Sequence, residues 1–331
     1  MYGLKDISRA LPEAQIIGPG VRSFKRIVID SRIAGKGDLF IPIKGAKFDG
    51  SDFIPEVLKK GASVLETDNG LQALQQLAAY WRGKFKVTVI GVTGSVGKTT
   101  TKDMIAAVLS RKMKTLKNEE NFNNEIGVPL TLLRLGKNHK AAVIEMGMQG
   151  PGEIELLSRL ARPAVAVVTN IGEAHLEFLK TKKNIANAKA EIFRHVARGG
   201  WAVINQDDEF YENLKVRITD YGLRFTTFGI LEKADITPKA LEGIELPIPG
   251  QHNIYNALAA AAVAKIMKIG RKELKKGLEK FTPSSKRMEV IIRKRDGVKI
   301  INDTYNANPQ SMGASLETIG GMEGRRIAVM G

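Results

Sequence analysis

Apolar residues gather in short runs along the chain, and segments with helical spacing of apolar positions separate them. The runs are KVTVIG at 86–91, AAVIEM at 141–146, AVAVVTN at 164–170, GWAVIN at 200–205, VKIIN at 298–302 and RIAVM at 326–330. Strands with little alternation between apolar and polar residues are typically covered on both faces. Because these runs alternate with helical segments, the pattern predicts an α/β fold with a mostly parallel sheet.

Two stretches stand apart from this alternation. Proline and glycine divide 224–250 into short pieces, which predicts a small β excursion. A helix is expected over 309–319, between the last two apolar runs.

Polar breaks divide the chain into three expected domains. The turn at 82–84 closes an N-terminal α/β domain at 1–84. A polar segment then ends a central parallel-sheet, phosphate-loop domain at 85–296 and begins a Rossmann-like unit at 297–331. This last unit has too few elements to cover a parallel sheet, so we expect the chain to end inside that domain.

The composition is that of a soluble globular protein, with 43% hydrophobic and 26% charged residues among 331. No apolar run approaches the ~18 residues of a membrane span, so no membrane insertion is expected. The chain has no cysteine, which excludes disulfides and thiolate metal sites and fits a cytoplasmic enzyme.

The net charge of +16 calls for an anionic partner or a solvated basic surface. The densest basic stretch, 265–295, has few aromatic residues for stacking bases and no motif of a nucleic-acid reader. We therefore expect a small anionic substrate and no nucleic acid, with a charge-rich surface as the alternative.

A glycine-rich loop, GVTGSVGKTT at 91–100, follows a predicted strand and begins a helical segment. Such a loop binds phosphates through backbone N–H groups and a helix N-terminus. Lys98 would neutralise the β- and γ-phosphates, and Thr99 would ligate Mg²⁺. The first glycine lies one position early for the general motif, so a plain turn before a helix is the alternative.

Two further polar residues follow strands at the edge where α/β sheets bind their ligands. Glu145 lies near the end of the run 141–146, and His175 lies just past the run 164–170. Each could be an ordinary surface residue. Together with Lys98, they predict a phosphate site with more than one Mg²⁺ ion.

Lys189 lies on the apolar face of the segment 184–196, which is predicted to be a helix. At 100° per residue, Ile185, Ile192 and Phe193 share this face. A buried ammonium is costly unless it is paired or loses its charge. Two interpretations stay open: a side chain that extends its charge to water, or an amine with a lowered pKa and a chemical role.

The chain resembles the Mur ligase family, ATP-dependent amide-bond ligases of peptidoglycan precursor synthesis, at TGSVGKTT (93–100), Glu145, His175 and NAKAEIF (187–193). The family loop T-G-x-x-G-K-T accounts for the displaced glycine. The resemblance implies ATP, two Mg²⁺ ions and a carbamylated Lys189. It implies catalytic roles for Lys98, Glu145, His175 and Lys189, and metal ligation by Thr99, Glu145, His175 and Lys189. The implied ATP-binding residues of the loop are Gly94, Ser95, Val96, Gly97, Lys98, Thr99 and Thr100.

Within the family, 121–133, 250–262 and 303–309 resemble the member that adds D-alanyl-D-alanine. This resemblance implies nucleotide contacts by Asn253, Asn256, Arg287 and Asp303, and substrate contacts by Asn121, Asn123 and Asn124. The segment 30–54 resembles the domain that binds the UDP part of the substrate, with Ser31, Arg32, Asp49 and Gly50 at the matching positions.

The implied activity is a ligase, most simply a monomer, that joins D-alanyl-D-alanine to UDP-N-acetylmuramoyl-tripeptide through an acyl phosphate. Three alternatives remain: a sibling Mur-type or folylpolyglutamate-type ligase, a nucleotide-binding module without ligase activity, and a nucleic-acid-binding NTPase suggested by charge alone.

Overall fold

The computed structural model describes residues 1–45, 47–174, 176–231, 233–284, 286–293, 295, 297–305, 307 and 309–330, except the side chain of residue 310. By their internal contacts, these residues form two compact units. The first unit is Met1–Lys86 with Glu125–Lys137, and the second is Val87–Asn124 with Asn138–Gly331. The three-domain division expected from the sequence stays a prediction.

The second unit is built on a six-stranded sheet whose strands are all parallel. In chain order they are β7 (Thr88–Thr93), β8 (Thr115–Lys117), β9 (Ala141–Glu145), β10 (Val165–Val168), β11 (Trp201–Asn205) and β12 (Arg224–Phe228). Their order across the sheet is β12-β11-β10-β7-β9-β8. The four inner strands bury nearly every residue, as expected of strands covered on both faces. The predicted parallel α/β sheet is confirmed.

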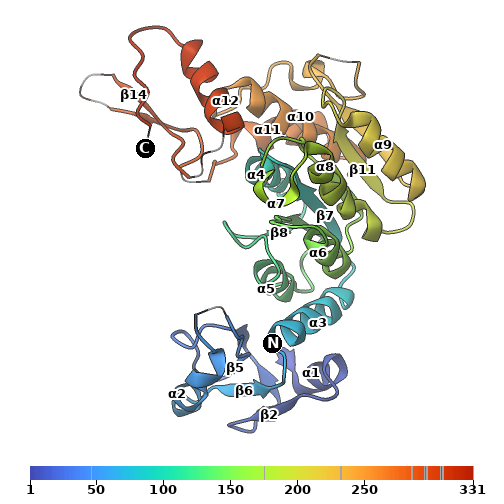
Figure 1. The fold of residues 1–331 in the computed structure, drawn as a ribbon, viewed down its shortest axis with the longest axis vertical. Helices are drawn as coiled ribbons and strands as arrows, with labels where there is room; N and C mark the ends of the chain where they lie inside the picture. The colour runs from blue at the N-terminus through green and yellow to red at the C-terminus, as the bar shows by residue number, and fades with distance from the viewer. Residues whose placement is uncertain are drawn as a thin grey trace. The chain divides into compact units, whose positions relative to one another are not determined.

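Helices cover both faces of this sheet (Figure 1). One face carries α4 (Lys98–Leu109), α10 (Gln251–Ile266) and α11 (Arg271–Glu279); the other carries α6 (Glu153–Ala161), α8 (Lys182–Ala190) and α9 (Tyr211–Asp220). Small residues allow close packing: a Cβ at Gly277 of α11 would lie 2.6 Å from the Cα of Val108 in α4. The helix expected over 184–196 ends earlier, at Ala190, and continues as the 3₁₀ turn η2 (Glu191–His195).

Two expectations about strands are wrong. In its described residues, the stretch 224–250 forms no separate β excursion: its first residues join the main sheet as β12 and bury Thr226, Thr227 and Phe228, and an isolated bridge links Phe228 to Ile236. Its remainder holds the 3₁₀ turn η3 (Pro238–Leu241). Residues 326–330 form no strand; Val329 is 93% exposed, and a strand needs a neighbour for its backbone groups.

The end of the described chain contains a pairing that the sequence did not predict. β13 (Glu289–Ile292) pairs with β14 (Lys299–Asn302), and the pairing is antiparallel. The helix α12 (Pro309–Gly320) follows and confirms the helix expected there. A short helix, α7 (Leu176–Leu179), precedes α8.

The first unit has a four-stranded sheet in the order β2-β6-β5-β4. Its strands are β2 (Gln15–Ile17), β4 (Arg26–Val28), β5 (Asp38–Phe40) and β6 (Ser63–Glu66), with a separate pair of β1 (Tyr2–Gly3) and β3 (Ser23–Phe24). Its helical elements are α1 (Leu4–Ala10), η1 (Gly50–Phe53), α2 (Ile54–Lys59), α3 (Gly70–Gly83) and α5 (Gly127–Leu133).

The longest helix of the first unit, α3, follows directly from its sequence. The side chain of Asn69 caps its N-terminus by accepting the N–H of Gln72 at 3.0 Å. Helical spacing then buries Leu74, Leu77 and Trp81 on one face. The Trp81 ring packs against Tyr2, with 4.5 Å between ring centroids.

Candidate nucleotide and metal site

The glycine-rich loop lies where the strand order of the sheet reverses. β7, the first strand of the sheet in the chain, lies between β9 and β10: the chain adds β8 and β9 on one side of β7 and then crosses to add β10 on the other side. In parallel α/β sheets, the carboxyl ends of the strands at such a point form the ligand-binding crevice. The loop at 94–97 joins β7 to α4 at this position.

Glycine is required at both ends of this loop. Gly94 has φ +150°, and a Cβ there would lie 1.9 Å from the Oγ1 of Thr169. Gly97 has φ +81°, and a Cβ there would lie 2.3 Å from the Oδ1 of Asn256. The loop therefore has its shape only because two side chains can approach its backbone closely.

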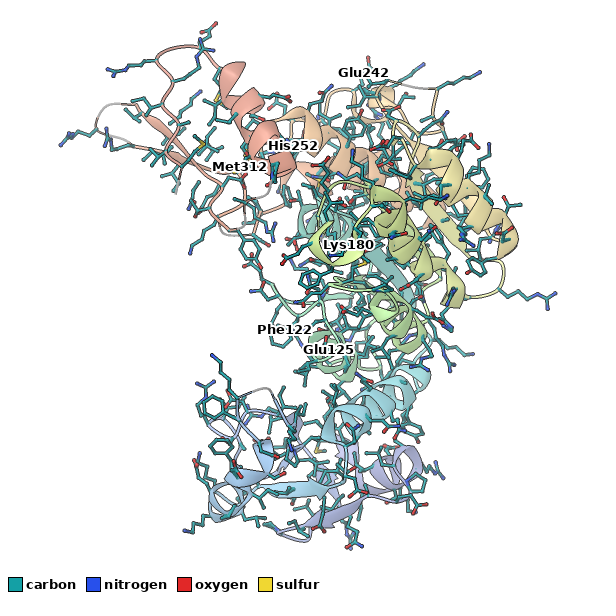
Figure 2. The ribbon with its side chains drawn as sticks, in the orientation of Figure 1. Phe122, Glu125, Lys180, Glu242, His252 and Met312 are labelled. Atoms are coloured by element: carbon teal, nitrogen blue, oxygen red, sulfur yellow. The ribbon has the colours of Figure 1, made fainter. Side chains whose placement is uncertain are left out.

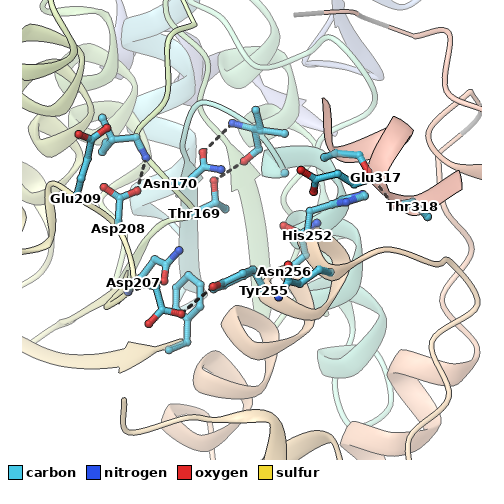
Figure 3. Close-up of a pocket in the computed structure, with 17 residues that line it drawn as sticks. Thr169, Asn170, Asp207, Asp208, Glu209, His252, Tyr255, Asn256, Glu317 and Thr318 are labelled. Carbon is cyan, nitrogen blue, oxygen red and sulfur yellow. Dashed lines mark hydrogen bonds between the residues drawn. The ribbon is translucent and has the colours of Figure 1, made fainter. Parts of the chain in front are cut away.

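The residues that follow β10 hold the backbone of the loop by hydrogen bonds. The Oδ1 of Asn170 accepts the backbone N–H groups of Ser95 at 3.1 Å and Val96 at 2.9 Å. The hydroxyl of Thr169 donates to the carbonyl of Val96 at 2.6 Å (Figure 3). The first N–H groups of α4, including those of Thr99 and Thr100, have no partner within the helix and are the donors left for a phosphate.

Lys98 and Lys189 converge on one carbonyl of the loop. The ammonium of Lys98 donates to the carbonyl of Gly94 at 2.8 Å, and that of Lys189 donates to the same oxygen at 2.9 Å. Burial lowers the pKa of Lys98, which the negative charge of Glu145 partly opposes and the positive charge of Arg287 reinforces. Burial and then the charge of Lys98 hold the pKa of Lys189 well below its usual value. With 2% of its surface exposed, Lys189 does not extend to water.

Glu145 ends β9 and is almost completely buried, with 5% of its surface exposed. Its Oε1 accepts the side-chain N–H of Asn123 at 2.8 Å. Its Oε2 lies 3.6 Å from the ammonium of Lys102, a buried residue of α4 that sequence reasoning missed. His175, the third expected ligand, lies outside the described residues.

The residues beside the loop offer ligands that suit Mg²⁺ only in part. In the part of the chain that the structure describes, no three acidic or histidine side chains are grouped to hold a metal alone. Glu145 and the buried hydroxyl of Thr99 nevertheless offer oxygen donors beside the phosphate loop. Mg²⁺ usually keeps several waters and binds one or two carboxylates plus substrate phosphates. The residues therefore fit an ion that arrives with a nucleotide.

A cavity of about 560 Å³ opens beside the loop (Figure 3). Val96, Gly97 and Asn256 of the expected nucleotide-binding set line it. The other lining residues include Thr169, Asn170, Asp207, Asp208, Glu209, His252, Tyr255, Glu317 and Thr318. Sequence reasoning missed most of these, although the run at 205–209 lies at the carboxyl end of β11, where the strand-end argument used for Glu145 would have found it.

Hydrogen bonds fix the walls of this cavity. The Oδ2 of Asp207 accepts the hydroxyl of Tyr255 at 2.8 Å, and that of Asp208 accepts the N–H of Ile171 at 2.7 Å. Burial raises the pKa of Asp208. Figure 2 shows His252 at the start of α10, beside α12.

The two buried asparagines of α10 hold each other. Asn256 donates to the Oδ1 of Asn253 at 3.1 Å and accepts the hydroxyl of Thr101 at 3.0 Å. Asn253 itself does not appear on the cavity wall, so it positions Asn256.

Arg287 and Asp303 contact other protein side chains and do not line the cavity. The guanidinium of Arg287 lies 3.8 Å from the ring centroid of Tyr305 and 3.6 Å from Glu120. Asp303 accepts the N–H of Met288 at 3.1 Å and the hydroxyl of Ser315 at 2.5 Å. Neither residue appears on the cavity wall. The charge of Arg287 still reaches the site, since it acts on Lys98.

Family models and relatives match this architecture. The model of the Mur ligase middle domain matches residues 92–264, that of the Mur ligase family catalytic domain 23–119, and that of the Mur ligase glutamate ligase domain 286–331. A Bacillus subtilis protein named UDP-N-acetylmuramoyl-tripeptide–D-alanyl-D-alanine ligase is 38% identical over 92% of this chain and 72% of its own. The Escherichia coli protein of that name is 33% identical over 92% of this chain and 74% of its own.

The chain belongs to the Mur ligase family.

Solved structures agree with this assignment. A crystal structure of MurF from Acinetobacter baumannii superimposes with a TM-score of 0.90 at 33% identity, over 98% of this chain and 78% of that one. MurF from Thermotoga maritima in complex with ADP gives a TM-score of 0.80 at 30% identity, over 91% of this chain and 75% of that one. The glycine-rich loop thus belongs to a Mur ligase, and its role in binding phosphate stays a prediction.

In the first unit of this Mur ligase, the expected UDP-binding residues are held by local contacts. The carboxylate of Asp30 binds Arg32, with 2.7 Å between Oδ2 and Nη2, and this bond lowers the pKa of Asp30 to about 2. Asp49 accepts the N–H of Ser51 at 2.9 Å. A Cβ at Gly50 would lie 2.6 Å from the backbone N of Ile43.

Ser31 is buried, and its carbonyl accepts the ammonium of Lys60 at 3.0 Å. The contacts named above therefore fix residues 30–32 and residues 49–51 independently of each other. In the second unit, Asn121 of the expected substrate set accepts the hydroxyl of Tyr305, and Asn123 is bound to Glu145; Asn124 lies next to them in the chain. Across the described ranges, no helix has the length and apolar character that crossing a membrane requires.

Proposed function

We propose that this chain is the ATP-dependent ligase that joins D-alanyl-D-alanine to UDP-N-acetylmuramoyl-tripeptide in peptidoglycan precursor synthesis. One observation carries the chemistry: the partly buried Lys98 and the buried Lys189 meet at the Gly94 carbonyl of a phosphate loop. The names of the relatives, at 31–38% identity, support the choice of substrates.

ATP binds with its phosphates at the loop and its base and ribose in the adjoining cavity. Gly94, Ser95, Val96 and Gly97 shape the loop, and the N–H groups of Lys98, Thr99 and Thr100 and the Lys98 ammonium hold the β- and γ-phosphates. Asn256, positioned by Asn253, contacts the base. Arg287 and Asp303 join the nucleotide when their segment approaches it. The acidic wall residues suit the donating hydroxyls of a ribose.

Lys189 is carbamylated in this proposal. Its depressed pKa favours the neutral amine. The amine nitrogen forms a bond to the carbon of CO₂ and releases one proton, which leaves a carbamate anion. The carbamate offers oxygen ligands in place of an ammonium and turns a cationic side chain into an acidic one.

Two Mg²⁺ ions would be held by Thr99, Glu145, His175 and the carbamate of Lys189. When bound, they offset negative charge on the transferred phosphoryl group and on the acyl phosphate. The chain itself orients the phosphates and excludes water from them. No side-chain nucleophile is needed.

The reaction has two steps. A carboxylate oxygen of the tripeptide attacks the γ-phosphorus of ATP, and the bond to the bridging oxygen breaks to release ADP. The amino nitrogen of D-alanyl-D-alanine then attacks the acyl carbon of the acyl phosphate. The carbon–oxygen bond to phosphate breaks, the nitrogen loses a proton, and an amide and inorganic phosphate result.

The first unit binds the UDP part of the substrate through Ser31, Arg32, Asp49 and Gly50. Asn121, Asn123 and Asn124 contact the substrate in this proposal, and the bond from Asn123 to Glu145 supports that role. The enzyme works in the cytoplasm as a monomer, with no nucleic-acid or membrane partner. The absence of cysteine and the basic charge, which suits a substrate with a diphosphate and carboxylates, support this proposal.

The test is ligation by this chain with ATP, Mg²⁺ and UDP-N-acetylmuramoyl-tripeptide, with the product identified by mass spectrometry. We expect an amide product and ADP only when D-alanyl-D-alanine is the amine. A product with L-glutamate or a single amino acid instead would assign the chain to a sibling activity. Binding of ATP and UDP-substrate without any product would leave only a nucleotide-binding module.

A further inference from the structure

Lys102 is one helical turn beyond Lys98 on α4, and the two lysines therefore share a face of that helix. With 1% of its surface exposed, Lys102 cannot reach substrate or water. Its ammonium donates to the carbonyl of Asn118 at 3.2 Å and lies 3.5 Å from Asp103 and 3.6 Å from Glu145. A buried ammonium persists only when paired in this way.

Of the two carboxylates near the ammonium of Lys102, Glu145 is its main partner. Asp103 already has two other partners, since its Oδ1 lies 2.6 Å from the ammonium of Lys117 and its Oδ2 accepts the hydroxyl of Ser284 at 2.7 Å. The Oε1 of Glu145 accepts the side-chain N–H of Asn123, and its Oε2 lies 3.6 Å from the ammonium of Lys102. Among the described residues, no other cation is paired with this carboxylate at 4.0 Å or less.

Lys102 also supports the backbone beside Glu145. The side chain of Asn118 accepts the N–H of Glu145 at 2.9 Å and donates to its carbonyl at 3.1 Å. Lys102 in turn binds the carbonyl of Asn118. The lysine thus contacts both the carboxylate and the residue that fixes the end of β9.

We propose that Lys102 is a positioning residue, which holds the carboxylate of Glu145 in the orientation that a nucleotide-bound Mg²⁺ requires. The inference rests on the proposed function only in taking Glu145 as a metal ligand. Lys102 itself touches no substrate.

Two physical effects of removing Lys102 have opposite signs. Loss of an outer partner of a metal ligand typically weakens metal binding about 10–100-fold, because the ligand loses its orientation. Loss of a positive charge near a dication would instead strengthen binding. The direction of the change therefore separates positioning from simple repulsion.

The experiment titrates Mn²⁺ into the protein with ADP, without turnover, and follows free Mn²⁺ by electron paramagnetic resonance. We expect Lys102→Met to weaken Mn²⁺ binding about 10-fold, with ADP affinity in the absence of metal unchanged. The matched control, Lys117→Met, removes a cation from the same cluster without touching Glu145, and it should bind Mn²⁺ as the wild type does. Unchanged or tighter binding by a folded Lys102→Met protein would overturn the inference.

Folding is checked by circular dichroism. If Lys102→Met does not fold, Lys102→Gln serves the same titration, because its amide can still donate to Asn118 but carries no charge. Glu145→Gln separates the two proposals. If it binds Mn²⁺ as tightly as the wild type, the metal site itself is wrong; if only the Lys102 variants match the wild type, the positioning role alone is wrong.

Discussion

The phosphate loop and the segment 30–54 are both expected to bind phosphate-containing groups, yet they are built differently. The loop is held by residues distant in sequence: Ser95 by Asn170, 75 positions away, and Thr101, just beyond the loop, by Asn256, 155 positions away. In 30–54, the side chain of Arg32 donates to Asp30 and the N–H of Ser51 donates to Asp49, and each of these bonds spans two positions. The loop therefore has its shape before ligand arrives, whereas the exposed Arg32 is free to change partner when the substrate binds.

This difference predicts how substitutions act. At the loop, a change of one atom displaces groups on several strands, and function is lost with it. At 30–54, a substitution removes one contact to the ligand and leaves the unit intact. The predictions below test this contrast, from the largest expected effect to the smallest.

Gly94→Ala should weaken ADP binding roughly 100-fold or more, because the new Cβ would lie 1.9 Å from Thr169 and displace the loop. Isothermal titration calorimetry measures the affinity. Gly152→Ala is the control: that glycine also has a positive φ of +83°, but nothing lies near its Cβ position. Equal ADP affinity of the Gly94 variant and the wild type would show that the loop is not fixed in advance.

Lys189→Ala should lower substrate-dependent phosphate release by roughly 100-fold, because losing a metal ligand should cost at least as much as losing an outer partner of one, which costs about 10–100-fold. Short carboxylic acids should restore part of the activity by replacing the carbamate. The pKa of Lys189 is depressed, and lowering the pH protonates its amine and removes the carbamate. Wild-type activity should therefore decrease as the pH is lowered, whereas the variant rescued by a carboxylic acid should follow a different pH profile. Full activity of Lys189→Ala without an added carboxylic acid would contradict the carbamate.

A substitution at Tyr2 tests the stability of the buried part of the first unit, outside the segment 30–54. Its hydroxyl donates to the carbonyl of Leu133 at 2.6 Å, and burial raises its pKa to about 12 from 10. The folded state keeps this proton up to a higher pH, so the stabilisation is complete below pH 10 and is lost as pH rises through 12. The loss amounts to about 3 kcal/mol at most.

The measurement is urea unfolding at pH 9 to 12, followed by fluorescence of Trp81 in a Trp201→Phe background. Tyr2→Phe should remove most of this pH dependence. An unchanged alkaline loss of stability in the variant would assign it to another group.

Arg32→Ala should weaken binding of UDP-N-acetylmuramoyl-tripeptide roughly 10-fold, the loss of one charge-assisted hydrogen bond. The side chain is 85% exposed and pairs with Asp30, so thermal unfolding should not change. Lys5→Ala, which removes an exposed charge from α1 of the same unit, is the control. Equal affinity of both variants would move the UDP site elsewhere.

The sequence predicted the features that local patterns encode. Uninterrupted runs of Val, Ile and Ala predicted the parallel strands β7, β9, β10 and β11. Helical spacing predicted that Lys189 faces the core, and the structure buries it against the phosphate loop. Glu145 was predicted at the carboxyl edge because it ends a buried strand.

The missed features depend on partners distant in the chain. No local pattern indicates that Asn170 binds the N–H groups of Ser95 and Val96. The antiparallel pairing of β13 and β14 likewise depends on which strand meets which. The burial of Lys102 could have been predicted, because the spacing argument used for Lys189 places it with Ile105 and Leu109 on the buried face of α4.

The central claim is that ATP transfers its γ-phosphoryl group to the substrate carboxylate. The most direct test uses UDP-N-acetylmuramoyl-tripeptide labelled with ¹⁸O in that carboxylate, together with ATP, Mg²⁺ and D-alanyl-D-alanine. An acyl phosphate leaves one carboxylate oxygen on the released phosphate, so mass spectrometry should find a single ¹⁸O in each phosphate. Released phosphate without ¹⁸O, alongside amide formation, would contradict the account.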